Sequence, residues 1–264
     1  MGVSLIKKRR SAPDGGGRYK HFRGDFQLQG YEKEIITDIH DADYNGVCRT
    51  SSLMKYIQST AQDQLTSGGM SYENLIAKKR AFLLSKIRME ISEPVRAYEH
   101  ITATTYPCES RGFSFPRCYT LSCRGHIVAR AVSVWALIDT ETRQLVRVSD
   151  FDLPFPKLAP LDLTMRRISL PSSMVRVGDY RVCYGGVDQN RHMNNTRYPD
   201  IYSDFLPLDG RYISQISISY LHEAPLGTNL AVERGEAEGE YFFRTMRPDG
   251  LINSEAEITL SDIG

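Results

Sequence analysis

The pattern of elements along this 264-residue chain occurs twice, and this duplication limits the available folds more than any other feature. In each half a strand-like segment is followed by one helical segment and then by several strand-like runs. A proline-rich stretch at 150–173 separates the halves. Because helices do not alternate with single strands, the pattern favours an α+β fold over a doubly wound parallel sheet. Each half is expected to pack one long helix on an antiparallel sheet.

Hydrophobic periodicity and turn residues place the individual elements. In the first half we expect helices at 51–65 and 72–79 and strands at 26–39, 81–91, 99–108, 113–123 and 126–139. In the second half we expect a helix at 195–206 and strands at 175–184, 212–221, 229–235, 240–246 and 251–260. A proline is tolerated only in the first turn of a helix, so Pro199 requires the second helix to begin between 194 and 197.

These boundaries predict four segments. Residues 1–20 form a flexible basic arm that contains Lys7-Lys8-Arg9-Arg10 and a run of glycines. Residues 21–149 and 174–264 form the two similar units. The connector at 150–173 carries several apolar side chains among its prolines, so we expect it to pack against the body of the protein.

Composition excludes several classes of protein. A formal charge of +1 gives no electrostatic footprint for bulk nucleic-acid binding. The best apolar run, 127–138, is interrupted by Arg130 and is too short to span a membrane, which takes about 20 residues. The basic N-terminus has no apolar stretch after it, and the five cysteines include no Cys-x-x-Cys pair. We therefore expect reduced thiols, a cytoplasmic location, no bound metal and no cofactor.

The densest polar cluster of the chain, residues 185–195, lies between a predicted strand and the second predicted helix. Free backbone N–H groups at a helix start can stabilise a developing oxyanion. Taken singly, an Asp or Asn before a helix is most often a cap, and a lone His in a loop is usually solvated. The combination of Asp188, Asn190 and His192 running into Asn194, Asn195 and Tyr198 is rarer and marks a candidate site.

The stretch from Asp188 to Tyr198 resembles the signature of the acyl-acyl-carrier-protein (acyl-ACP) thioesterases, plant plastid enzymes and their bacterial relatives. The run SSLMKYIQSTA at 51–61 resembles the helix of the family's first half. Further similar runs are RAVSVW at 130–135 and TRQL at 142–145. They occur in the family's order and extend from about residue 22 almost to the end. This resemblance implies a tandem hotdog fold, in which each half wraps an antiparallel sheet around a long helix.

The resemblance also implies a catalytic network of Asp188, Asn190 and His192, completed by Glu223. Many plant members carry a cysteine directly after this glutamate, whereas this chain has Ala224, which excludes a cysteine nucleophile there. Attack by an activated water molecule is the scheme that survives. We expect Glu223 and His192 to activate the water, Asn190 to position the carbonyl or the water, and Asp188 to orient the network. Whether Glu223 or His192 accepts the proton stays open.

The first half contains an echo of this motif, Asp41, Asp43 and Asn45, but no histidine. We therefore expect it to be catalytically silent and, by resemblance, to shape the acyl tunnel. The candidate substrate-binding residues are Leu53, Tyr56, Ile57, Trp135 and, at the start of the second helix, Asn194. The alternative for each of the apolar residues is an ordinary place in the core.

The predicted reaction is hydrolysis of a fatty acyl-ACP thioester, with acyl carrier protein as the partner. Carrier proteins are acidic, so Arg166, Arg167, Arg176 and Arg181 are candidate contacts. An acyl-CoA thioesterase is the main alternative. A hotdog hydratase is disfavoured because the chain lacks the spacing Asp-x-Asn-Pro-x-His, and a non-catalytic acyl-binding module remains a third possibility. Acyl-chain preference is undetermined, and both a monomer and a homodimer are open.

Overall fold

The computed structural model describes residues 30–264, so the predicted basic arm at 1–20 lies outside the described residues. Within these described residues one ten-stranded sheet is formed, and all its neighbouring strands are antiparallel. Its order is β1-β3-β4-β5-β2-β7-β10-β9-β8-β6. The strands are β1 (Tyr31–Ile36), β2 (Arg80–Ile91), β3 (His100–Pro107), β4 (Phe115–Cys123), β5 (His126–Asp139), β6 (Val175–Arg181), β7 (Arg211–Tyr220), β8 (Asn229–Ala237), β9 (Glu240–Met246) and β10 (Ile252–Asp262).

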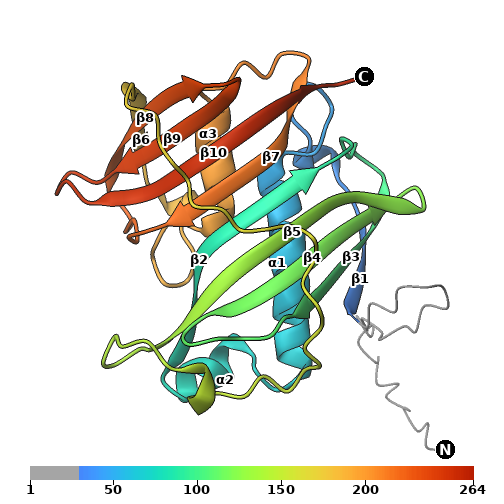
Figure 1. Cartoon of the computed structure of the whole chain (residues 1–264), viewed down its shortest axis with the longest axis vertical. Helices are drawn as coiled ribbons and strands as arrows, with labels where there is room; N and C mark the ends of the chain where they lie inside the picture. Colours follow the sequence, from blue (N-terminus) through green and yellow to red (C-terminus); the bar gives the residue numbers. More distant parts are fainter. Residues whose placement is uncertain (1–29) are drawn as a thin grey trace, which may run out of the picture.

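The two halves join in the middle of the sheet, where β2 pairs with β7 from Lys86↔Ser219 to Glu90↔Gln215. Each half contributes five strands in the same spatial order outward from this seam. The helices α1 (Thr50–Ser67) and α3 (Tyr198–Ser203) lie side by side on one face of the sheet, and α2 (Tyr72–Ala77) lies near one end of α1 (Figure 1). The duplicated sequence pattern is therefore a duplicated structure.

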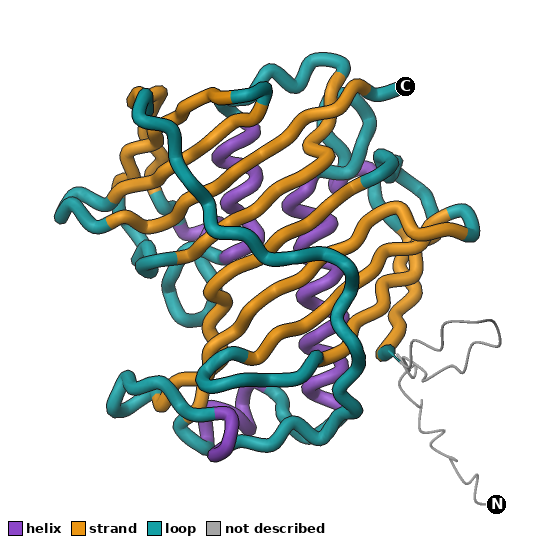
Figure 2. Tube along the Cα trace, in the orientation of Figure 1, coloured by secondary structure: helices purple, strands orange, loops and turns teal. Residues whose placement is uncertain are grey.

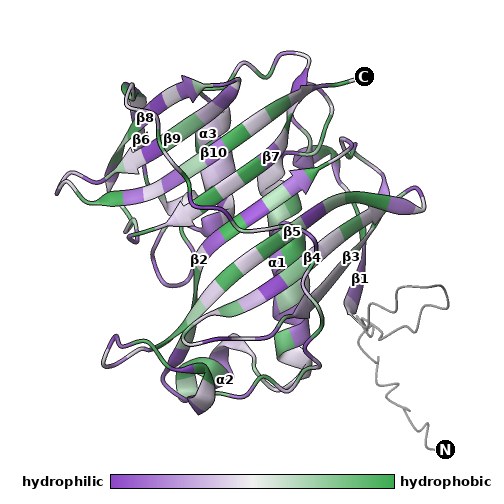
Figure 3. Ribbon diagram, viewed as in Figure 1, coloured by the Kyte–Doolittle hydropathy of each residue, from purple (hydrophilic) through white to green (hydrophobic). Residues whose placement is uncertain are grey.

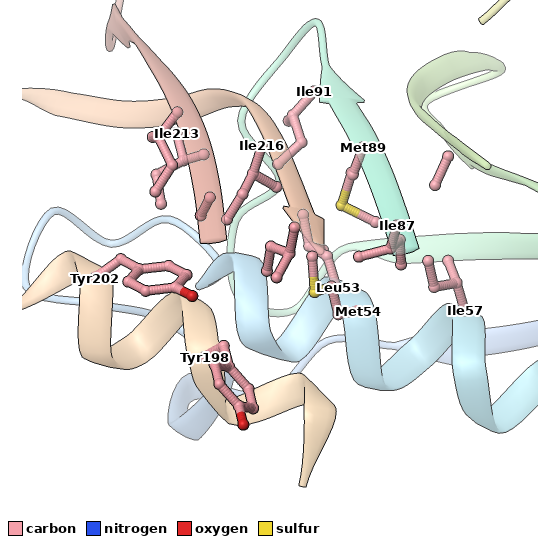
Figure 4. Close-up of a cluster of buried hydrophobic side chains, with 14 of the residues drawn as sticks. Leu53, Met54, Ile57, Ile87, Met89, Ile91, Tyr198, Tyr202, Ile213 and Ile216 are labelled. Atoms are coloured by element: carbon pink, nitrogen blue, oxygen red, sulfur yellow. The ribbon is translucent and has the colours of Figure 1, made fainter. Parts of the chain in front are cut away.

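The core lies between the helices and the sheet because both present apolar side chains to each other. Leu53, Met54 and Ile57 of α1 pack toward Ile87 and Met89 of β2 in one continuous cluster (Figure 4). Apolar and polar residues alternate along the central strands, so that opposite faces differ in character (Figure 3). Burying one such side chain stabilises the fold by about 1.5–3 kcal/mol, which explains why the strand pattern was readable in the sequence.

The connector crosses the face of the sheet opposite the helices (Figure 2). Leu158 forms an isolated parallel bridge with Cys108, and Leu163 is buried against Tyr106. The guanidinium of Arg88, on β2, donates a hydrogen bond to the Thr164 carbonyl at 3.1 Å. The connector is therefore packed on the body, as its apolar residues indicated.

The second helix is shorter than the sequence pattern predicted. A 3-10 turn over Asn195–Arg197 leads into α3, with Pro199 in its first turn as expected, but α3 ends at Ser203 and not near Leu206. Pro207 directly follows Leu206, and a proline disfavours helical backbone at the residue before it. The prediction of a long helix in each half was thus wrong for the second half, where the chain turns back toward β7 within a few residues.

Candidate active site

The polar cluster forms a tight loop whose backbone is closed on itself. The Asp188 N–H donates to the His192 carbonyl at 2.9 Å, and the Arg191 N–H donates to the Asp188 carbonyl at 3.0 Å. A carboxylate oxygen of Asp188 accepts the Asn190 N–H at 2.8 Å, and Arg191 adopts a left-handed backbone with φ 63°. Asp188 therefore stabilises the conformation of the loop that carries Asn190 and His192.

A second segment brings Glu223 to this loop. The Met193 N–H donates to the Ala224 carbonyl at 2.8 Å, which fastens the two segments together. The His192 Nδ1 atom lies 3.5 Å from the Glu223 Oε1 atom, and the side chains are 29% and 36% exposed. Glu223 lies in the loop after β7, just beyond the strand predicted at 212–221. The neighbouring His222 turns away, with its Nδ1 atom 2.7 Å from the Ile252 carbonyl oxygen.

Buried and partly buried polar residues hold the Glu223 segment in place. The Asn253 amide donates to the His222 carbonyl and to the Tyr198 hydroxyl, and the Arg247 guanidinium donates to the Glu223 carbonyl at 3.1 Å. Burial raises the pKa of Tyr198 to about 12, so its hydroxyl stays protonated in this network. Sequence reasoning missed Asn253 and Arg247, because neither belongs to a local motif.

Two side chains of the first half also reach the site. The Tyr72 hydroxyl, at the start of α2, donates to Asn190 Oδ1 at 2.9 Å. The Arg143 guanidinium donates to Glu223 Oε2 at 3.2 Å. Neither contact was predicted: Tyr72 carried no signal, and Arg143 was noted only within the TRQL run.

Two hollows meet at Asn190. A cavity of about 180 Å³ lies between α1, α2 and the adjoining strands, and the side chains of Leu65, Phe82, Phe115 and Trp135 give it a largely apolar wall. A larger, open hollow of about 560 Å³ is lined by His192, Glu223 and their neighbours. Both are lined by Ala81, Phe82, Asp188 and Asn190. An elongated molecule with a reactive group at Asn190 could thus place its two arms in different hollows.

The predicted substrate-binding residues take different places. Trp135 lines the cavity, with its indole N–H donating to the Ser133 hydroxyl at 2.7 Å. Leu53 and Ile57 are 1% exposed, face the sheet and do not line this cavity; its α1 wall is formed by Gln58, Ala61, Gln62 and Leu65.

The other two substrate-binding candidates have hydrogen-bond partners outside the cavity. The Tyr56 hydroxyl donates to the Asp41 carboxylate, and burial together with this bond raises its pKa. Asn194 caps the following 3-10 turn, accepting the Thr196 N–H at 2.9 Å.

The corresponding loop of the first half corrects the predicted alignment of the repeat. There the Asp43 N–H donates to the Val47 carbonyl at 2.8 Å and the Gly46 N–H to the Asp43 carbonyl at 3.0 Å, the same pattern as in the second half. The loops therefore match Asp43 with Asp188, Asn45 with Asn190 and Val47 with His192, and the predicted match of Asp41 with Asp188 was displaced by two residues.

The counterpart of Glu223 follows from the same hydrogen bonds. The Cys48 N–H donates to the Val95 carbonyl at 2.7 Å, as Met193 does to Ala224, so Pro94 occupies the position of Glu223. The first half thus carries Val47 and Pro94 where the second carries the imidazole and the carboxylate. The absence of a histidine from this loop was anticipated, and the structure adds that the carboxylate is missing too.

Two five-stranded halves, each with a helix on the same face of a continuous antiparallel sheet, define a double hotdog fold. The arrangement matches the crystal structure of an acyl-ACP thioesterase from Bacteroides thetaiotaomicron with a TM-score of 0.77, at 20% identity over 88% of this chain and 98% of that one. It also matches the 12:0-ACP thioesterase from Umbellularia californica, with a TM-score of 0.75, 13% identity and coverage of 88% and 97%.

The family follows from the sequence. Residues 29–152 match the acyl-ACP thioesterase N-terminal domain, and residues 172–260 match the acyl-ACP thioesterase C-terminal domain. The chain belongs to the acyl-ACP thioesterase family.

Two chloroplastic acyl-[acyl-carrier-protein] hydrolases from Cuphea viscosissima are similar to it. FATB3 is 25% identical over 196 residues, which cover 67% of this chain and 45% of that protein, and FATB2 is 22% identical over 255 residues, which cover 86% and 59%. The chain spans about half the length of these curated relatives.

Two further observations concern residues 30–264. No helix there is both long and apolar enough to cross a membrane. No group of three or more His, Cys, Asp or Glu side chains within the same range is placed to hold a metal ion.

Proposed function

We propose that the protein hydrolyses the thioester of a fatty acyl-acyl carrier protein and releases the free fatty acid. The observation that carries this proposal is the position of Asn190, where the apolar cavity meets the open hollow that holds the His192–Glu223 pair. In this scheme the acyl chain enters the largely apolar cavity, and the linker to the carrier lies in the open hollow. The scissile carbonyl would then lie beside Asn190.

The residue types suit general-base hydrolysis. Water, deprotonated by the His192–Glu223 pair, attacks the thioester carbon, and the carbonyl oxygen takes up negative charge. The Asn190 Nδ2 amide can donate to that oxygen, because Oδ1 already accepts the Tyr72 hydroxyl. Collapse of the intermediate breaks the C–S bond, and the proton taken from water passes to the leaving thiolate. A positioned base contributes about 10²–10⁴ in rate and an oxyanion donor about 10²–10³.

The nucleophile in this scheme is water because the chain has no thiol beside Glu223. Ala224 occupies that position, and its carbonyl instead accepts the Met193 N–H. Asp188 acts through the loop: it accepts the Asn190 N–H at 2.8 Å, and its second oxygen lies 3.4 Å from Asn190 Nδ2. We assign Asp188 to orientation, Asn190 to carbonyl binding, and His192 with Glu223 to proton transfer.

We propose acyl carrier protein as the partner because the related proteins are named acyl-ACP hydrolases. Of the basic candidates, Arg176 and Arg181 lie on the edge strand β6, and Arg176 is paired with Asp179 at 2.5 Å, which lowers its value as a contact. Acyl-CoA presents the same thioester chemistry, so only a direct comparison separates the two substrates. We also propose a cytoplasmic location, where thiols stay reduced.

The test is release of free thiol from matched acyl-ACP and acyl-CoA thioesters over a range of chain lengths. We expect turnover of the ACP thioesters that falls by at least about 100-fold in His192→Ala and in Glu223→Ala. Circular dichroism and melting temperature establish that the variants are folded. Turnover of acyl-CoA without turnover of acyl-ACP would show that coenzyme A, and not the carrier protein, carries the substrate. Tight acyl binding without turnover in the unmodified protein would refute the hydrolase assignment.

A further inference from the structure

The Glu223 carboxylate has a different neighbour at each oxygen. Its Oε1 atom lies 3.5 Å from His192 Nδ1, and its Oε2 atom accepts a hydrogen bond from the Arg143 guanidinium at 3.2 Å. Arg143 belongs to the first half, 80 residues earlier in the sequence. The half that lacks the histidine and the glutamate therefore supplies a cation to the site.

The turn that carries Arg143 is tightly held. Arg143 has a left-handed backbone with φ 60°, and its N–H donates to the Asp139 carbonyl at 2.9 Å. The Asp139 carboxylate accepts the N–H groups of Glu141 and Thr142 at 3.0 and 2.9 Å. A bulky residue adopts this backbone only where the surroundings enforce it. The turn therefore fixes the direction in which the Arg143 side chain leaves the sheet.

We propose that Arg143 is a positioning residue for Glu223: it holds Oε2 so that Oε1 faces His192. The proposal rests on the proposed function, in which Glu223 takes part in proton transfer. Arg143 also lines the open hollow, where it lies beside the path proposed for the substrate. A guanidinium suits this role because it presents several fixed donors and stays charged at any working pH.

Three other charged or titratable residues lie near the Glu223 carboxylate. His192 faces Oε1, and Asp188 lines the same hollow as a second carboxylate. Arg247 contacts only the Glu223 main chain with one nitrogen, and its other nitrogen pairs with Asp249 at 2.6 Å. Among residues 30–264, Arg143 is thus the cation whose removal affects the orientation of the Glu223 carboxylate most directly.

The test is the effect of Arg143→Gln and Arg143→Lys on kcat and KM. Without the guanidinium, the Glu223 Oε2 atom loses its donor and the carboxylate can turn away from His192, so kcat falls while KM changes little. Because the pair is partly exposed and screened, we expect a fall in kcat of about fivefold or less. Arg143→Lys restores kcat at least in part.

Lys79→Gln is the matched control, because it removes one positive charge that pairs with Glu141 in the same turn and does not contact Glu223. It should leave kcat and KM unchanged. A rise in KM with an unchanged kcat in Arg143→Gln would assign Arg143 to substrate binding and overturn the proposal, as would a variant with unaltered kcat and KM. The unmodified protein and Glu223→Gln, measured in parallel, separate the failures. If the unmodified protein releases no thiol, the proposed function fails. If Glu223→Gln has normal turnover, the assignment of Glu223 to proton transfer fails, and if only Arg143→Gln has no effect, this inference alone fails.

Discussion

Replacing Tyr72 with Phe removes one hydroxyl from the site and leaves the ring in place. That hydroxyl donates to Asn190 Oδ1 at 2.9 Å, and the Asn190 Nδ2 atom lies 3.4 Å from the Asp188 carboxylate. Together these contacts fix which way the amide points. Without the hydroxyl the amide can rotate, and for part of the time it presents oxygen, an acceptor, to the oxyanion that needs a donor.

The magnitude follows from one neutral hydrogen bond. Such a bond contributes about 0.5–1.5 kcal/mol net, which corresponds to about 2- to 13-fold in rate when it is expressed in the transition state. Tyr72 is only partly buried and Asn190 is exposed, so water can replace the hydroxyl. We therefore expect kcat to fall about 2- to 5-fold. Asn190→Ala, which removes the donor itself, should lower kcat by a factor of about 10²–10³.

The assay is a double-mutant cycle on kcat for thioester hydrolysis with Tyr72→Phe, Asn190→Ala and the combined variant. If Tyr72 acts through Asn190, adding Tyr72→Phe to Asn190→Ala should have no further effect. Glu73→Gln is a suitable control, because this neighbouring side chain of α2 bonds its own helix start. A loss in the combined variant equal to the two single losses together would refute the reasoning, since Tyr72 would then act independently of the amide.

Three further predictions concern stability. Gly68→Ala should lower the free energy of unfolding by about 1–3 kcal/mol, seen as a lower denaturation midpoint, because the new Cβ would lie 2.4 Å from Cζ of the buried Phe155 ring. Leu163→Ala should cost about 2 kcal/mol by loosening the connector, with activity at 25 °C retained. The backbone hydrogen bond from Thr142 lowers the pKa of Asp139 from 3.8 to about 2, so its stabilising effect is present above pH 3.8 and is lost as the pH falls through about 2. The melting-temperature deficit of Asp139→Ala should accordingly be full at pH 7 and shrink between those two values; a deficit independent of pH would contradict this.

Sequence reasoning succeeded where one physical effect dominates a local stretch. The strands were readable because each central strand buries one face, as Ile87 and Met89 do in β2 and Ile216 and Ile218 do in β7. The second helix was overestimated because Ile201 and Phe205 continue a helical spacing that Pro207 then ends. Periodicity reports which residues prefer burial, but the length of an element also depends on where its backbone can continue.

The candidate site shows a different limit. Asp188, Asn190 and His192 lie within five residues and could be found as a motif, and Glu223 entered through the resemblance. Tyr72 and Arg143 reach the same site across 118 and 80 residues of chain, so no local pattern marks them. The misaligned repeat has a related cause: several Asp and Asn residues offer a match, and only the backbone hydrogen bonds choose among them.

The two corresponding loops differ in the partners of their asparagine side chains. Asn45, the counterpart of Asn190, directs its amide nitrogen to the carbonyls of Leu208 and Arg211 at 2.7 and 3.2 Å, in the segment that leads from α3 into β7. Its oxygen accepts the Gly210 N–H at 3.2 Å. Because both ends of its amide are bonded to backbone groups of the second half, Asn45 joins the two halves and is not free to bind a carbonyl.

The same relation viewed from the other side accounts for Asn190. Its amide also contacts the segment that follows the helix of the opposite half, where its oxygen accepts the Tyr72 hydroxyl. Its nitrogen lies 3.4 Å from the Asp188 carboxylate of its own loop and has a second N–H to donate. A shorter second helix places backbone carbonyls against Asn45, whereas the longer α1 and the separate α2 place one side chain against Asn190. The difference in helix length that the sequence pattern failed to predict therefore accompanies a difference in role: Asn45 joins the two halves, whereas Asn190 keeps one N–H to donate where the cavity and the open hollow meet.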